Sequence, residues 1–309
     1  MLILRPRDRG SSDEILDPQL QLDVPLGQLV CICGPSGGGK SALLRQLCQG
    51  LPGTTDGRTR FAVDATGIRR CIDLSLQCMG REDETLLQML MLSRDLARLF
   101  AASPAAVENQ WPSEWFELER PGGRCPRCEG LGQIVHRLEY VEDLIVTCPQ
   151  CEGRRFREEI FEATLRGASM AELLGMTTGE AARFLHREPR PHAVLQAAAA
   201  SGLAAVPLGL AVGRLDPSQR LRALLAGYSG RADRRDLFVA ERPGAGEGGQ
   251  GAQQMAAALR RLVSTGATVW VSQGPAVTPE TADWVLEMAP GTGADGACVL
   301  LSSTAVTAA

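Results

Sequence analysis

The feature that most constrains this chain is a glycine-rich loop, GPSGGGKS, which fits the pattern G-x-x-x-x-G-K-[ST]. An apolar run, LVCIC, precedes the loop, and a stretch with helical spacing, SALLRQLCQGL, follows it. Glycines let backbone N–H groups close around phosphates, and the following helix directs its positive end at them. We therefore predict a phosphate-binding loop for a nucleotide, formed by Gly34, Pro35, Ser36, Gly37, Gly38, Gly39, Lys40 and Ser41.

Lys40 is the only lysine among 32 basic residues, the rest being arginine. A chain that uses arginine wherever a cation will serve keeps lysine here, where a compact point charge is required. We expect Lys40 to reach the terminal phosphates of the nucleotide and the Ser41 hydroxyl to bind Mg²⁺. The competing interpretation is a glycine loop that holds no ligand.

The 309 residues are many for one domain, so we expect two lobes or an insertion. In the last third, strand patterns (DLFVA, ATVWVS, ACVLLS) alternate with helical ones, which predicts an α/β fold with a mostly parallel sheet. The expected helices include residues 84–102, 169–174, 178–185, 217–226 and 279–288. A net charge of −4 excludes a generally basic nucleic-acid coat but leaves room for a local basic groove.

No apolar run approaches the length of a membrane span. The start, MLILRPRDRG, places arginines after a short apolar run, the reverse of a secretory signal. We therefore expect a cytoplasmic protein without membrane partners.

Two C-x-x-C pairs are separated by 19 residues, and between them QIVHRLEY and EDLIVTC suit a hairpin. This spacing predicts a closed, structural four-thiolate zinc site of Cys125, Cys128, Cys148 and Cys151. Reduced thiols or a redox pair are the alternative. The other six cysteines lie scattered in apolar stretches and are expected to be small buried residues.

A second acidic motif is the place where nucleotide hydrolysis would be expected. The best candidate is the strand pattern DLFVA followed by Glu241 and Arg242. Glu241 is the candidate catalytic residue and would help to hold Mg²⁺ through water. Arg242 has no accessible neutral form and is unable to act as a base.

Four segments carry a resemblance to a known family: GPSGGGKSALLRQL, GGRCPRCEGLGQ, TCPQCEGRRF and TADWVLEMAPGTGADG. They resemble UvrA, the ATP-binding, damage-recognising subunit of the bacterial excision-repair nuclease (excinuclease) and an ABC-class ATPase. The resemblance runs from about Leu20 to Gly296 and matches one ABC half, most like the C-terminal one. It implies an ABC-type core, 1–112 and 201–309, with an inserted signature and zinc region, 113–200.

The departures from the family pattern are specific. The family's LSGGEAQR signature is shortened to LDPSQR (215–220), its Asp-Glu-Pro becomes Glu241-Arg242-Pro243, and its switch histidine is replaced by Gln273. Gln77 is the nearest candidate for the family's glutamine. Asp216 followed by proline is typical of a helix N-cap, which would occupy free N–H groups at the signature helix.

The resemblance implies ATP, Mg²⁺ and Zn²⁺ as cofactors, DNA as a partner, and a homodimer or a full-length UvrA-type partner to complete a site. Arg154, Arg155 and Arg157 are candidates for DNA phosphate contact, with a solvated charged face as the alternative. Trp111 and Trp115 are candidates for stacking on bases, with core packing as the alternative. Three hypotheses stay open: an ATP-binding, DNA-associated protein with little hydrolysis, a working repair ATPase, and a non-enzymatic scaffold or regulator of a protein partner.

Overall fold

The computed structural model describes residues 2–6, 22–50, 61–64, 67–77, 81–136, 144–290 and 298–305. The chain divides into two compact units, and the second is inserted into the sequence of the first. The first unit comprises Met1–Gly80 and Asp216–Ala309, and the second comprises Arg81–Leu215. The three-part division at 112/113 and 200/201 stays a prediction, beside these units divided at 80/81 and 215/216.

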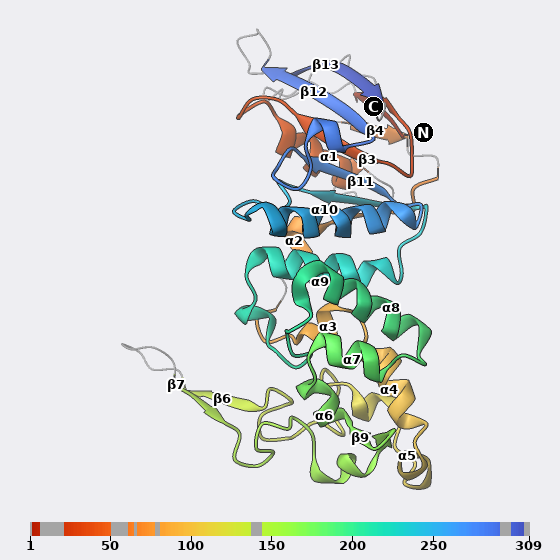
Figure 1. The fold of residues 1–309 in the computed structure, drawn as a ribbon, viewed down its shortest axis with the longest axis vertical. Helices are drawn as coiled ribbons and strands as arrows, with labels where there is room; N and C mark the ends of the chain where they lie inside the picture. Colours follow the sequence, from red (N-terminus) through yellow and green to blue (C-terminus); the bar gives the residue numbers. More distant parts are fainter. Residues whose placement is uncertain are drawn as a thin grey trace. The chain divides into compact units, whose positions relative to one another are not determined.

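The first unit is built on a six-stranded sheet with the order β13-β12-β3-β11-β10-β5. Figure 1 labels β13, β12, β3 and β11 of this sheet. All neighbouring strands are parallel except β12 and β13. Continuous apolar runs suit strands covered on both faces, and the central strands are buried as that pattern predicts. The strand bounds are Leu29–Cys33 (β3), Arg70–Asp73 (β5), Asp236–Ala240 (β10), Thr268–Ser272 (β11), Trp284–Pro290 (β12) and Cys298–Ala305 (β13).

A smaller antiparallel sheet, β2-β1-β4, and four helices complete the described part of this unit. Helix α1 buries Leu43, Leu44 and Leu47 in the same core as Val30 and Trp270. The strand bounds are Leu2–Pro6 (β1), Leu22–Val24 (β2) and Phe61–Asp64 (β4). The helix bounds are Lys40–Gly50 (α1), Leu74–Gln77 (α2), Pro217–Ser229 (α9) and Gly249–Ser264 (α10). The predicted α/β fold with a mostly parallel sheet is confirmed.

The predicted helix over 279–288 is wrong. The structure has a short 3-10 turn, Pro279–Thr281 (η5), followed by strand β12. Periodicity does not separate helix from strand in an apolar run of this length. Tertiary context decides: β12 fills the place between β3 and β13 and forms hydrogen-bonded ladders on both sides.

The second unit consists of short helices with small antiparallel ladders. The predicted helix over 84–102 is divided into two by Met91, whose φ is +57°. Capping boxes begin α3, α6 and α7, at Thr85, Ser169 and Thr177. The helix bounds are Leu86–Met89 (α3), Ser93–Ala101 (α4), Pro104–Glu108 (α5), Met170–Gly175 (α6), Thr178–Phe184 (α7) and Pro189–Ala198 (α8).

The ladders of the second unit include the hairpin predicted between the cysteine pairs. Strands β6 (Gln133–His136) and β7 (Leu144–Thr147) pair antiparallel. A second ladder joins β8 (Thr164–Leu165) to β9 (Ala168–Ser169). The remaining short helical turns are η1 (Ser113–Phe116), η2 (Glu158–Glu162), η3 (Ala199–Leu203) and η4 (Val212–Arg214). Among the described residues, no helix combines the length and apolar character needed to cross a membrane.

Candidate functional site

The phosphate-binding loop, residues 34–41, leaves the sheet at the carboxyl end of β3. Gly34 has φ +136°, and a Cβ there would lie 2.1 Å from the Met288 carbonyl oxygen of β12. Glycine is therefore required at the point where the chain turns away from the sheet. A turn closed by the Gly38 N–H donating to the Pro35 carbonyl (3.1 Å) follows, and residues 35–37 are exposed.

Lys40 begins α1 and folds back over the loop. Its ammonium donates to the carbonyl oxygens of Gly34 (2.8 Å) and Pro35 (2.6 Å). The first turn of α1 leaves backbone N–H groups without helical acceptors, which favours an anion at this end. The cation, the helix terminus and the exposed loop together form a cradle whose chemistry suits a polyphosphate.

Other segments also lie at the carboxyl-terminal end of the sheet, because the parallel strands all end there. The Gln273 N–H donates to the Ile32 carbonyl (2.8 Å), next to the loop. The Arg242 N–H donates to Ser272 Oγ (2.8 Å), and the Glu241 N–H to Ser75 Oγ (3.1 Å). In open parallel sheets, ligands bind outside the carboxyl ends of the strands, so these residues stand where a nucleotide would meet them.

Glu241 and Arg242 follow β10 directly, and both side chains are exposed. The Glu241 carboxylate lies 3.9 Å from Arg45 Nε, with 41% and 65% of the two side chains exposed. An exposed pair of this kind contributes little to stability, so the Glu241 carboxylate is not committed to Arg45. Arg242, held at φ +41°, presents a permanent cation at the position next to that carboxylate.

Gln77 and Asp216 are the other two positions that the family resemblance singled out, and the structure describes the side chain of Asp216 only. Gln77 is the last residue of α2, and its side chain lies outside the described part of the structure. Asp216 caps α9: its Oδ1 accepts the Gln219 N–H at 2.8 Å, and Pro217 follows. An N–H at the start of α9 is therefore already used by a carboxylate of this chain.

Two knuckles of the second unit bring four cysteines together. Each knuckle has the sequence C-P-x-C-E-G, and each turns through a glutamate and a glycine at positive φ: Glu129 (+51°) and Gly130 (+88°), then Glu152 (+50°) and Gly153 (+83°). Hydrogen bonds join the knuckles to flanking backbone, from the Cys125 N–H to Arg155 O and from the Cys148 N–H to Gly132 O.

The four sulfurs, those of Cys125, Cys128, Cys148 and Cys151, all lie within 4.8 Å of one another and are buried. Four thiolates in a closed cluster are the donor set of a structural zinc site, so the residues fit the ion. Burial raises the pKa of the Cys151 thiol to about 12. For Cys148, burial acts in the same direction, but hydrogen bonds from backbone N–H groups of Cys151 and Gln150 outweigh it and lower the pKa to about 7. A buried cation would compensate the charge of such a set.

The three arginines proposed for DNA contact differ in burial and in the contacts that they make. Arg155 is half-buried, and its guanidinium donates to the carbonyls of Gly130 (3.2 Å) and Gly209 (2.8 Å), so it fixes the first knuckle. Arg154 lies over the Phe161 ring at 4.6 Å and is exposed, as is Arg157. Only the latter two remain candidates for phosphate contact. Trp111 and Trp115 stack on each other with centroids 6.4 Å apart.

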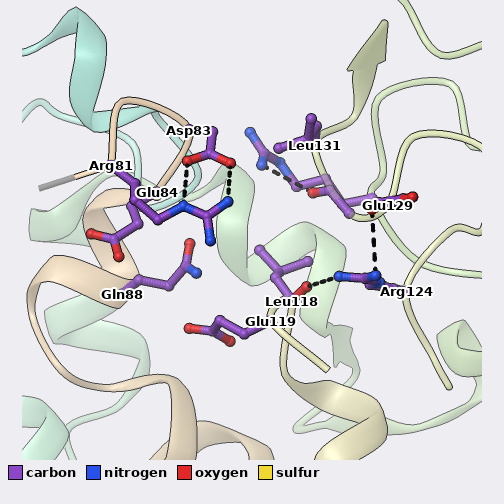
Figure 2. A pocket seen from close by; sticks show the side chains of 11 residues that line it. Arg81, Asp83, Glu84, Gln88, Leu118, Glu119, Arg124, Glu129 and Leu131 are labelled. Atoms are coloured by element: carbon purple, nitrogen blue, oxygen red, sulfur yellow. Dashed lines mark hydrogen bonds and ion pairs between the residues drawn. The ribbon is translucent and has the colours of Figure 1, made fainter. Parts of the chain in front are cut away.

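A pocket of about 160 Å³ lies beside the first knuckle (Figure 2). Two of its arginines pair with acidic residues that line the same pocket. Arg81 donates two hydrogen bonds to Asp83 (3.0 and 2.7 Å), and Arg124 lies 3.5 Å from Glu129. Burial raises the pKa of Glu84. Since its cations are already paired, the pocket offers no set of donors that would select an anion.

Comparison with known proteins gives matches over nearly the whole chain. UvrABC system protein A of Thermus thermophilus is 32% identical over 292 residues, which are 92% of this chain and 31% of that protein. The Escherichia coli K12 protein of the same name is 29% identical over 298 residues. The chain belongs to the UvrA family. It spans about a third of the length of these UvrA relatives.

A solved structure gives the same result. The crystal structure of UvrA2 from Deinococcus radiodurans matches with a TM-score of 0.78 and 27% identity, over 98% of this chain and 37% of that one. No protein-family model matches the sequence. The resemblance inferred from the loop and the two knuckles is therefore confirmed, and so is the UvrA-like fold.

Two features were missed from the sequence. Arg222 of α9 and Glu247, in the glycine-rich loop after β10, form a buried ion pair of 2.9 Å, with 10% and 11% of the side chains exposed. Cys48 and Cys71, expected to be separate buried residues, form a disulfide. The buried pair carried no signal, because its residues lie 25 positions apart in unremarkable stretches. The sequence showed Cys48 and Cys71 only as two of six scattered cysteines, with nothing to indicate that they pair.

Proposed function

We propose that this chain is a UvrA-like ATP-binding protein with a structural zinc ion, associated with DNA in an excision-repair role and weak or inactive in hydrolysis. The observation that carries the proposal is the phosphate-binding loop, with Lys40 held over its carbonyls and Arg242 at the same sheet edge. Mg²⁺ would lie between the Ser41 hydroxyl and Glu241. The zinc ligands would be the four knuckle cysteines. The proposal places the protein in the cytoplasm.

The partner follows from the shortened signature. In ABC proteins, nucleotide bound by one half is completed by the signature loop of another half. We propose a homodimer or a full-length UvrA-type partner for this role. Because Asp216 already occupies an N–H at the start of α9, this chain's own signature would clamp a partner's terminal phosphate weakly.

A titration of the purified chain with a non-hydrolysable ATP analogue and with DNA, each in the presence of the other, tests the proposal. We expect saturable analogue binding and a DNA affinity that changes when the analogue is present. Absence of DNA binding in both conditions would favour the alternative, a scaffold or regulator of a protein partner. Coupled binding with rapid turnover would favour a working repair ATPase.

Steady-state phosphate release by the chain, alone and with DNA, is expected to stay near background. A catalytic base contributes a factor of about 10²–10⁴, and here the position after Glu241 holds Arg242. The double variant Glu241→Asp with Arg242→Glu should give the largest rescue, in the presence of a partner with an intact signature. Lys40→Ala in the same background is the control, because it should return the rate to background. Robust release by the natural chain that survives Glu241→Ala would contradict this assignment.

A further inference from the structure

A disulfide joins the helix of the phosphate-binding loop to the edge of the sheet. Cys48 lies near the end of α1 and Cys71 lies in β5, with their Cα atoms 5.2 Å apart and a separation of 23 positions in sequence. The bond closes a loop that includes β4. It therefore connects two elements that also pack against each other through ordinary contacts.

The position of the bond links it to the nucleotide site. Cys48 lies eight residues after Lys40 on the same helix, about 12 Å along its axis. Cys71 is three residues from the start of α2, the segment that ends at Gln77. The bond thus ties the helix that begins in the phosphate-binding loop to the strand that leads into the glutamine segment.

The other cysteines whose side chains the structure describes do not share this chemistry. Cys31 is buried, and burial raises its pKa to about 12, so its thiol stays protonated. Burial also raises the pKa of Cys33. The four knuckle cysteines converge on one another. Cys48 and Cys71 are half-buried where they pack against the core, so part of each residue remains exposed to solvent.

We propose that the Cys48–Cys71 bond is a reversible redox switch that sets how firmly α1, and with it the phosphate-binding loop, is held on the sheet. A glutathione thiolate attacks one sulfur, the other leaves as a thiolate, and a mixed disulfide forms. A second glutathione thiolate attacks the glutathione sulfur, which releases glutathione disulfide and leaves two protein thiols. Glutathione disulfide reverses both steps.

The reduced protein stays folded in this scheme, because Leu43, Leu44 and Leu47 still bury α1 in the core. What changes is the fraction of time in which the helix and loop hold the binding geometry. If reduction leaves that geometry populated for a third of the time, the apparent Kd for a nucleotide rises about threefold. The affinity part of the inference rests on the ATP binding proposed above, whereas the bond and the helix dynamics do not.

The test equilibrates the full, zinc-loaded chain in glutathione buffers from fully reduced to fully oxidised. Each sample is alkylated and mapped by mass spectrometry, and hydrogen exchange of residues 40–50 and the Kd of a fluorescent ATP analogue are measured in parallel. We expect linked Cys48 and Cys71 peptides in the oxidised state, unchanged zinc, and, on reduction, faster exchange in α1 with a Kd raised about threefold or more.

Variants separate the switch from a general thiol effect. The double variant Cys48→Ser with Cys71→Ser should match the reduced natural chain in both buffers, because neither thiol is left for glutathione disulfide to modify, and Cys298→Ser should keep the full response. Failure of the bond to form in the oxidised buffer would overturn the inference, as would a bond that leaves both α1 exchange and the Kd unchanged. If the analogue binds in neither state, the ATP proposal fails, and the exchange of α1 alone decides the switch.

Discussion

Replacement of Cys128 by serine is expected to remove zinc from the chain and to unfold the knuckle region of the second unit. The natural chain should carry about one zinc ion, since four thiolates form one closed site. Structural zinc contributes on the order of 10–16 kcal/mol to small metal-bound folds at neutral pH. Few other contacts would stabilise this region without the ion, because much of each knuckle is turn. The strands β6 and β7 of the hairpin between the knuckles are largely exposed.

The measurement is metal analysis of the purified variant, combined with limited proteolysis. We expect zinc to fall well below one ion per chain and cleavage to concentrate within residues 122–165. The first unit has its own core, so analogue binding by the variant should persist. Cys78→Ser, which removes a cysteine outside the four, should retain zinc. Natural protein with four free knuckle thiols and no zinc would rule out the metal site.

Zinc retention should also depend on pH in a defined direction. Thiols must lose protons to bind the ion, so protons compete with zinc, and affinity falls as the pH falls. Dialysis against a fixed chelator at a series of pH values should therefore strip the natural chain more completely at the acidic end. Retention that is independent of pH would contradict thiolate ligation.

The sequence predicted best those features that local chemistry determines. The phosphate-binding loop requires glycine where Gly34 approaches the Met288 carbonyl and a compact cation at Lys40, and both needs are visible as a motif. The knuckles repeat one six-residue pattern, and the turn through Gly130 and Gly153 follows from it. Such features are encoded within a few residues, so one chain is enough to recognise them.

Features that depend on distant packing were not predictable in the same way. The segment that begins with Trp284 is a strand because β3 and β13 flank it, not because its own residues exclude a helix. The role of Arg155 comes from carbonyls 25 and 54 residues away, which turned a candidate DNA contact into a support of the first knuckle. Neither relation leaves a periodic or compositional mark.

Replacement of Lys40 by alanine is expected to abolish most of the affinity for ATP. The ammonium donates to the carbonyls of Gly34 and Pro35 in the loop, from where it would meet the terminal phosphates of a bound nucleotide. Hydrogen bonds to charged groups contribute about 1.5–3 kcal/mol each. Loss of the cation should therefore raise the Kd of an ATP analogue by roughly 10²-fold or more. Lys40→Arg should also bind poorly, because the planar guanidinium is wider than the ammonium that two carbonyls hold within 2.8 Å.

Isothermal titration with a non-hydrolysable ATP analogue measures this effect, and the melting temperature without nucleotide shows whether the fold is retained. The Lys40 side chain bonds only to exposed or half-buried loop carbonyls, so we expect Lys40→Ala to melt close to the natural chain. Arg235→Ala removes an exposed cation just before β10, at the amino-terminal end of the parallel strands and away from the phosphate-binding loop. It should leave the Kd unchanged. If Lys40→Ala binds the analogue as tightly as the natural chain, the loop does not hold the triphosphate. If Arg235→Ala weakens binding as much as Lys40→Ala does, the affinity comes from the overall charge of the unit and not from a cation placed at the loop.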